Sequence, residues 1–244
     1  VGIVNYCRGG IFLGAWVNTP GTPNYLLSDY LTALTETGGS TEVFLWIGSE
    51  SDYLSYPANE RARFLSLRDQ IEDACGHNVV FVSDAIGRVT SVAYREYWPI
   101  VRNDITYICD TTERMWMGCE NYDIDLTGSD VHMSDSGQIV QANRMAQSVL
   151  YAMGTSGYTY YRGPRITSIT RTSDNVLTLG LTLNAAATDI SGTLNYFQVF
   201  RSEVELSSDY WAIEKVNANT LRITTDAGYE LPASLDDIEV RYLW

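Results

Sequence analysis

The chain is poor in lysine and histidine. Lys215 is the only lysine among 16 basic residues, and 30 acidic residues give a formal net charge of −14. Such a surface repels phosphate groups, which argues against nucleic acid and anionic membranes as partners. No hydrophobic run is long enough to cross a bilayer, so no membrane span is expected. The 45% apolar content is typical of a folded globular protein.

The four cysteines lack the spacing of a metal site. None of them forms a C-x-x-C pair, which argues against structural zinc. Cys7, Cys75 and Cys109 lie in or beside apolar runs, so we expect buried free thiols there. A Cys109–Cys119 disulfide across a loop is the alternative. We expect neither a metal nor an organic cofactor.

Strand-like and helix-like segments alternate over residues 1–156. We expect strands at 1–7, 42–47, 78–82 and 105–109, and helices at 24–37, 58–75 and 90–101, with Pro99 breaking or ending the third helix. A long loop should cover 110–130. Ser134 should cap a last helix whose apolar face has six residues: Ile139, Ala142, Ala146, Val149, Leu150 and Met153. This alternation predicts an α/β domain, a mostly parallel sheet with helices on both faces.

Residues 157–244 have a different pattern. Short β-rich runs occupy 165–171, 175–183, 196–201, 211–216, 220–224 and 238–243. Turn-forming residues such as Asp226-Ala227-Gly228 separate them. We therefore expect a second domain, a small all-β sandwich.

An acid and a histidine stand two residues apart just before the last expected helix. The chain has two histidines, and His132 is the one preceded closely by a carboxylate, Asp130. A histidine can take a proton from a serine hydroxyl when an acceptor holds its other ring nitrogen. Asp130 and His132 can thus be the acid and base of a catalytic triad. The alternative is a solvent-exposed turn in which Asp130 acts as a cap.

Further candidates follow two other strands, at the edge where reactive groups of parallel sheets collect. Gly9 and Gly10 would let a backbone N–H approach an oxyanion closely. Glu50 and Asp52 follow the strand at 42–47. The alternatives are a plain turn for the glycines and a solvated loop or helix cap for the acids. The aromatic residues Trp16 and Tyr53 are candidates for stacking on a sugar ring, although most aromatic side chains belong to cores.

Taken in order, these segments resemble the SGNH hydrolases, within them the sialate O-acetylesterase-like carbohydrate esterases. The family's I-G-L-I-N strand and G-G-T…W loop are similar to 1–5 and Gly9-Gly10-Ile11…Trp16 here. Its W-Y-Q-G-E-S-D block is similar to 46–52, and its final D-x-H to Asp130-Val131-His132. A trailing β-sandwich from G-P to R-Y-A-W is echoed by Gly163-Pro164 and 241–244.

Two departures from the family pattern stand out. The family's nucleophilic serine lies in a G-Q-S-N motif after a strand upstream of the one that Val1 begins, and this motif is absent from the sequence. Because that strand lies inside the family's sheet, we expect the natural protein to continue upstream of Val1. Gly48 stands where the family usually has the glutamine that helps shape the oxyanion region.

The resemblance implies a flavodoxin-like SGNH fold and a carbohydrate O-acetylesterase acting on an acetylated glycan. It assigns Asp130 and His132 to the triad and Gly9, Gly10, Gly48 and Glu50 to the oxyanion and substrate loops, with Trp16, Asp52 and Tyr53 lining the substrate site. The alternative is an inactive carbohydrate-binding or structural module of a cell-surface or virion protein, such as a phage spike, within an oligomer or larger assembly. A lipase or peptidase with the same triad is a third reading.

Overall fold

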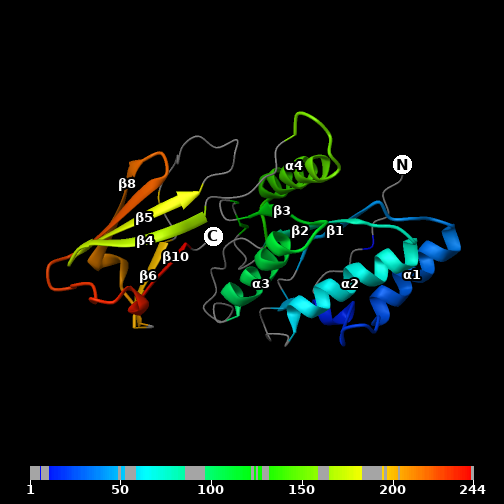
Figure 1. Cartoon of the computed structure of the whole chain (residues 1–244), viewed down its shortest axis with the longest axis horizontal. Coiled ribbons are helices and arrows are strands. Elements are labelled where there is room, and N and C mark those ends of the chain that lie inside the picture. The colour runs from blue at the N-terminus through cyan, green and yellow to red at the C-terminus, as the bar shows by residue number, and fades with distance from the viewer. Residues whose placement is uncertain are drawn as a thin grey trace. The chain divides into compact units, whose positions relative to one another are not determined.

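The computed structural model of the chain describes residues 6, 11–48, 51–52, 59–85, 97–121, 124, 126–127, 132–158, 165–182, 194, 197–202 and 204–242. The chain divides into two compact units, residues 1–161 and 162–244 (Figure 1). The first unit is mixed α/β, and the second is built of antiparallel strands.

The first unit is organised around a parallel sheet. Its strands are β1 (Val43–Trp46), β2 (Val80–Ala85) and β3 (Met115–Glu120), in the order β1-β2-β3. The main helices are α1 (Tyr25–Thr37), α2 (Glu60–Cys75), α3 (Trp98–Thr111) and α4 (Asp135–Ala152), and a short 3-10 turn, η1, covers Leu13–Ala15. Each strand runs in the same direction, so the carboxyl ends of all three meet at one edge.

Local sequence signals set the ends of these helices. Asn24 caps α1 by accepting a hydrogen bond from the Tyr25 N–H, and Gly38 ends the helix in the left-handed conformation. Gly76 ends α2 in the same way. Ser134 caps α4, since its side chain accepts a hydrogen bond from the Gly137 N–H. The expected helices at 24–37 and 58–75, and the cap at Ser134, are confirmed.

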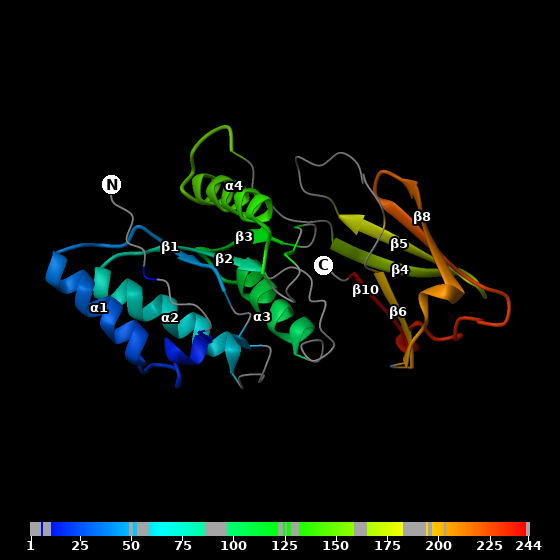
Figure 2. The same ribbon diagram turned by 180° about the vertical axis from the view of Figure 1, so that it is seen from behind.

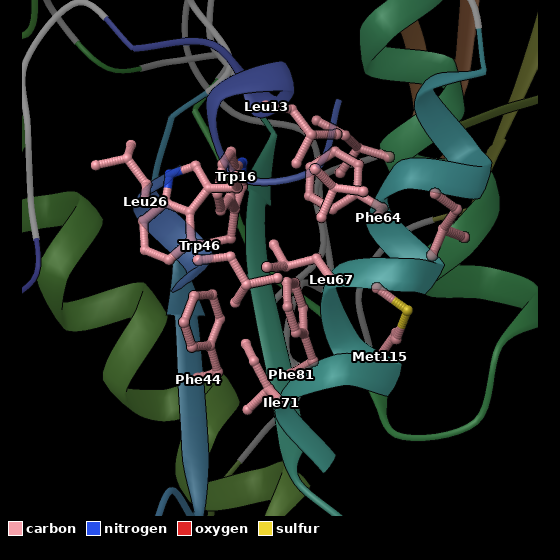
Figure 3. Close-up of a cluster of buried hydrophobic side chains, with 14 of the residues drawn as sticks. Leu13, Trp16, Leu26, Phe44, Trp46, Phe64, Leu67, Ile71, Phe81 and Met115 are labelled. Carbon is pink, nitrogen blue, oxygen red and sulfur yellow. The ribbon is translucent and has the colours of Figure 1, made fainter. Parts of the chain in front are cut away.

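One face of the sheet carries the larger core. Phe44 and Trp46 of β1 and Phe81 of β2 point into it and meet α1, α2 and α3 (Figure 3). Phe64, Leu67 and Ile71 of α2 supply most of its opposite wall, together with Leu13 of η1. The aromatic rings pack edge-to-face, as in the Trp46–Phe64 pair with centroids 5.3 Å apart.

Of the helices in the described part of the chain, α4 is the one on the other face of the sheet, opposite α1, α2 and α3 (Figure 2). Its Met145 packs against Val82 of β2 and Cys119 of β3. A Cβ atom at Gly118 would lie 2.1 Å from Met145 Sδ, so glycine is needed for this close approach. Ser148 Oγ donates a hydrogen bond to the Gly118 carbonyl at 2.8 Å. The helix therefore docks through polar as well as apolar contacts.

Three expectations about the segment 90–130 are wrong. Residues 105–109 belong to α3, since buried Trp98, Val101, Ile105 and Ile108 repeat at helical spacing. Pro99 stands at the start of this helix, where its missing N–H costs nothing, and does not end it. The expected loop at 110–130 contains β3, a buried strand interrupted in sequence by Gly118.

The apolar face expected for α4 packs on the sheet only in part, since Val149 contacts the core there while other residues of that face are exposed. The residues that α4 buries are Gly137, Gln141, Met145 and Ser148. Of the predicted apolar face, Ile139 is 64% exposed and Met153 is 54% exposed. The helix contacts the sheet through a mixed polar face because the hydrogen bonds of Gln141 and Ser148 lie there.

The second unit contains two antiparallel sheets that share one core. The four-stranded sheet has the order β4-β5-β9-β8, built from Arg165–Ser173, Val176–Thr182, Thr220–Thr225 and Trp211–Asn217. The other has the order β10-β6-β7, built from Ile238–Tyr242, Phe197–Arg201 and Val204–Glu205. Leu177, Leu221 and Val199 are fully buried between them. The six expected β-rich runs are all strands.

The described cysteines are free thiols. Cys119 is buried in β3, while Cys75 and Cys109 are half-buried in helices. The alternative of a Cys109–Cys119 disulfide is therefore wrong.

Candidate active site

The candidate site lies at the carboxyl edge of the parallel sheet. Gly48 follows β1, Asp84 is the second-last residue of β2, and Asn121 follows β3. His132 lies just before α4, on the polypeptide that returns from β3 to the opposite face. Parallel strands bring such loops together, which is why this edge is the usual place for ligands in α/β sheets.

Asp84 is the polar centre of this edge. The residue is completely buried. Its Oδ1 accepts a hydrogen bond from the Gly48 N–H at 3.2 Å. Its Oδ2 accepts from Asn121 Nδ2 at 3.1 Å and from Gln141 Nε2 at 2.9 Å. One carboxylate thus ties β2 to the ends of β1 and β3 and to α4, and we call these contacts the Asp84 network.

Asn121 has an oxygen available at the same edge. Its amide nitrogen is committed to Asp84, which fixes the orientation of the side chain. Its Oδ1 is buried and accepts no hydrogen bond. A buried acceptor without a donor is uncommon in native structures and is frequent at functional sites. Asn121 can therefore accept a hydrogen bond from a hydroxyl or amide that reaches the edge.

The backbone of His132 is anchored by Thr127. Its backbone carbonyl accepts hydrogen bonds from the Thr127 N–H at 2.9 Å and from Thr127 Oγ1 at 3.2 Å. Leu126 and Met133 form an antiparallel bridge beside it. The N-cap at Ser134 follows directly. The His132 backbone is thus anchored by Thr127 and is followed directly by the cap of α4, while its side chain is exposed.

The other histidine lies at the opposite edge of the sheet. His77 precedes β2, and its Nδ1 is 2.8 Å from the Asn78 carbonyl oxygen. Its Nε2 contacts Ser40 Oγ, from the segment before β1. His77 is therefore separated from the candidate site by the length of the strands.

Five of the sequence candidates lie outside the described residues: Gly9, Gly10, Glu50, Tyr53 and Asp130. Most of the expected first strand, 1–7, lies outside them as well. Gly48 is described, and its N–H points to Asp84. A Cβ atom at Gly48 would meet only Trp46 ring atoms at 4.0 Å, an ordinary contact.

Trp16 has a core position and not the expected place in a substrate site. It is 7% exposed, and its ring packs against Tyr6, Tyr30, Phe44 and Trp46 with centroids 5.8–6.2 Å apart. Its indole completes the aromatic part of the core between α1 and β1.

Asp52 supports the backbone and does not line an open surface. It is 1% exposed, and its two oxygens lie 3.0 and 3.1 Å from the Leu13 N–H that donates to them. This contact joins the segment after β1 to η1. A short polar residue is well suited to this task because a carboxylate accepts strongly from a backbone N–H.

Glu60 is an unusual buried acid close to Asp52. It is the first residue of α2, it is completely buried, and neither of its oxygens has a hydrogen-bond partner. Burial, followed by the nearby Asp52, raises its pKa to about 9, with Arg63 opposing and Asp104 adding to the rise. Glu60 is therefore a neutral acid at pH 7. This burial is not visible in the sequence, because an acid in the first turn of a helix is usually solvated.

The described residues contain no group of three His, Cys, Asp or Glu side chains that could hold a metal ion. Nor does any helix within these residues combine the length and the apolar character needed to span a membrane.

No family model matches the sequence, and no curated protein matches it. A solved structure of a carbohydrate acetylesterase from Xanthomonas citri superposes with a TM-score of 0.71, over 96% of this chain and 54% of that one. The chain has an esterase-like fold. The two sequences are 15% identical, so the likeness concerns the fold, and this chain spans about half the length of that esterase.

Proposed function

We propose that the chain is part of a carbohydrate O-acetylesterase of the SGNH type. The observation that carries this proposal is the fold, shared over nearly the whole chain with a carbohydrate acetylesterase. The sequence pair Asp130 and His132, just before α4, supports it, because Thr127 anchors the His132 backbone on the segment between the carboxyl end of β3 and α4. The substrate class is an acetylated glycan.

The proposed reaction is a double displacement at the acetyl carbonyl. A serine hydroxyl attacks the carbonyl carbon, and His132 takes the hydroxyl proton while Asp130 holds the imidazole. The Gly10 N–H stabilises the oxyanion, and His132 then gives the proton to the departing sugar oxygen. Water attacks the acetyl-serine by the same route, which releases acetate and restores the serine.

The serine that this reaction requires is not supplied by a G-Q-S-N motif in these residues. We place it outside residues 1–244. The solved esterase with this fold is about twice as long as the aligned region, which is compatible with a nucleophile elsewhere in such a protein.

The alternative is a module that keeps the fold and binds glycan without catalysis. The Asp84 network favours it, because the Gly48 N–H is used within the protein and does not face a substrate. The two proposals differ in what His132 does, and this makes them separable.

The test is acetate release from acetylated xylan, with p-nitrophenyl acetate as a second substrate, by the full-length protein. His132→Ala should lower kcat/KM by at least about a thousandfold, the usual cost of losing a triad base. His77→Ala is the matched control, since it removes the other histidine at the far edge, and should keep the activity. Equal rates for wild type and His132→Ala would remove the triad assignment. Glycan binding without acetate release would establish the non-catalytic alternative.

A further inference from the structure

Phe12 is a half-exposed aromatic residue on the segment that leads into η1. Its side chain is 49% exposed, whereas Leu13 and Ala15, which follow it, are buried in the core. In sequence it stands two residues after Gly10, the proposed oxyanion donor. Single exposed apolar residues are common at protein surfaces. Phe12 differs from them in how its ring is held and in where it lies.

The peptide group between Phe12 and Leu13 is fixed on both sides. Its carbonyl oxygen accepts a hydrogen bond from the Ala15 N–H at 2.9 Å. Its N–H donates to the buried carboxylate of Asp52, whose two oxygens lie at 3.0 and 3.1 Å. The backbone of Phe12 is therefore held by η1 and by the segment after β1. A ligand that contacts Phe12 does not have to order this backbone first, and such preorganisation favours binding.

The Phe12 ring packs against the backbone at Gly14. A Cβ atom at Gly14 would lie 2.5 Å from Phe12 Cε2 and 2.7 Å from Phe12 Cδ2, so any larger residue there would displace the ring. The Gly14 backbone is held in turn, since its carbonyl accepts a hydrogen bond from Asn24 Nδ2 at 2.7 Å. Phe12 thus has a fixed support inside the protein, while the rest of its ring faces solvent.

This segment lies at the carboxyl end of β1. Trp16, four residues after Phe12, packs its ring on that of Trp46, the last residue of β1, with centroids 5.8 Å apart (Figure 3). Asp52, which holds the start of η1, follows the same strand end. The Asp84 network occupies this edge of the sheet as well. Phe12 therefore belongs to the edge where the proposed reaction takes place.

A rigid, exposed phenyl ring is suited to the apolar side of a sugar ring. The face of the aromatic ring is electron-rich and attracts the weakly positive C–H groups of a pyranose, whose hydroxyl groups stay in water at its rim. The net charge of −14 favours neutral over anionic sugars. We infer that Phe12 is a specificity-determining residue that stacks on a neutral sugar ring of the acetylated glycan, an inference that rests on the proposed function. This is the role expected from the sequence for Trp16, which the fold buries.

Binding of deacetylated oligosaccharides tests the stacking without requiring catalysis. Isothermal titration calorimetry of the full-length protein with xylo- and manno-oligosaccharides should show binding of at least one of them. Phe12→Ala should raise its Kd about tenfold, because the stacking surface is lost, while Phe12→Trp should stay near wild type. Gly14→Ala should raise the Kd in the same direction although Phe12 is retained, since the new methyl group occupies the place of the ring.

Tyr151→Ala is the matched control. Tyr151 is 41% exposed, and its ring contacts Trp116, the second residue of β3 and thus at the amino end of that strand. Removing this half-exposed aromatic ring should leave the Kd unchanged. A rise equal to that of Phe12→Ala would overturn the inference, because the effect would not be specific to the carboxyl edge.

A comparison of two substrates separates a stacking role from a structural one. With acetylated xylan, Phe12→Ala should raise KM about tenfold and keep kcat. With vinyl acetate, which contains no ring, acetate release should stay near wild type. An equal loss with both substrates would mean that the loop is distorted and would overturn the inference. So would a selective loss with p-nitrophenyl octanoate, which would assign Phe12 to the acyl chain.

Failure of this inference and failure of the proposed function give different results. If the chain takes no part in ester hydrolysis, wild type releases no acetate, yet binding of the oligosaccharide that still weakens in Phe12→Ala supports the stacking role. If only this inference fails, acetate release persists, and Phe12→Ala has the Kd and KM of wild type. A wild type that binds none of the oligosaccharides would also overturn the inference.

Discussion

Gln141 Nε2 lies 2.9 Å from Asp84 Oδ2 and so joins the second turn of α4 to the carboxyl end of β2. His132 stands on the same polypeptide as Gln141, just before the N-cap of the helix. The position of the exposed His132 relative to the sheet therefore depends on the buried carboxylate of Asp84, which is distant from it in sequence.

Removing the Asp84 carboxylate should destabilise the first unit. Asp84→Ala leaves the side-chain amides of Asn121 and Gln141 and the Gly48 N–H without their acceptor in a buried place. We expect the free energy of unfolding to fall by about 3 kcal/mol, measured by urea denaturation. Asp29→Ala, on the exposed side of α1, is the control and should change it by less than about 0.5 kcal/mol. A small effect of Asp84→Ala would show that the network is dispensable.

Glu60 should make the protein less stable as the pH rises. Its pKa is raised from 4.5 to about 9 in the folded protein, so the folded state holds a proton that the unfolded state has lost. The stabilisation is complete below pH 4.5 and is lost progressively up to pH 9, at no more than about 1.4 kcal/mol per pH unit. Glu60→Gln keeps the shape of the neutral acid and should flatten this dependence. Urea unfolding at pH 5, 7 and 9 measures the slope, and identical slopes for both proteins would contradict the prediction.

Enlarging Gly118 should push α4 away from the sheet. A Cβ atom there would lie 2.1 Å from Met145 Sδ and 2.6 Å from Val82 Cγ1. We expect Gly118→Ala to lower the free energy of unfolding by about 2 kcal/mol. Met145→Ala should relieve part of this clash, so the double variant should be more stable than the sum of the two single effects predicts. Strictly additive changes in the free energy of unfolding, measured by the same denaturation assay, would mean that the added methyl group does not clash with Met145 of α4.

Introducing glutamine at Gly48 tests the proposed esterase through an expected increase in activity. The position has room for a side chain, and its backbone is not in the left-handed conformation that requires glycine. If Gly48 weakens the oxyanion region, Gly48→Gln should raise kcat/KM for p-nitrophenyl acetate by about tenfold. Gly48→Ala is the control for backbone effects and should leave the rate near that of wild type. Equal rates for the three proteins would show that this position does not contribute to the reaction.

The sequence predicted elements well where periodicity and caps agreed. The helix at 24–37 has an asparagine cap and a glycine stop, and the β-rich runs of the second unit alternate regularly. The prediction of a strand at 105–109 was wrong because a short β-branched run is typical of a strand. The spacing of the buried residues from Trp98 to Ile108 is helical. Strand β3 was not predicted because it contains Gly118, and glycine is a poor strand residue. The absence of a side chain at Gly118 leaves space for Met145 of α4.

The candidate site was only partly visible in the sequence. His132 was found because few histidines compete with it and Asp130 precedes it closely. Asp84 was missed, although an acid at the end of a buried strand is a signal that could have found it. Glu60 could not have been found, since its raised pKa arises from burial beside Asp52, a residue close in sequence whose approach only the fold fixes. The burial of Trp16 depended in the same way on tertiary packing.

Two of the hydrogen bonds that hold helix α4 to the sheet are far apart along its axis. Gln141 bonds Asp84 and Ser148 bonds the Gly118 carbonyl, and these donors are roughly 10 Å apart along the helix. Apolar contacts alone would let a helix slide lengthwise by a fraction of a turn, whereas directional bonds at two points forbid such a translation. The position of His132 along the helix axis is thus determined by residues that follow it in the sequence, up to sixteen residues further along the chain. Substitutions at Ser148 should therefore allow α4 to shift along its axis and displace His132, even though the two residues are sixteen positions apart.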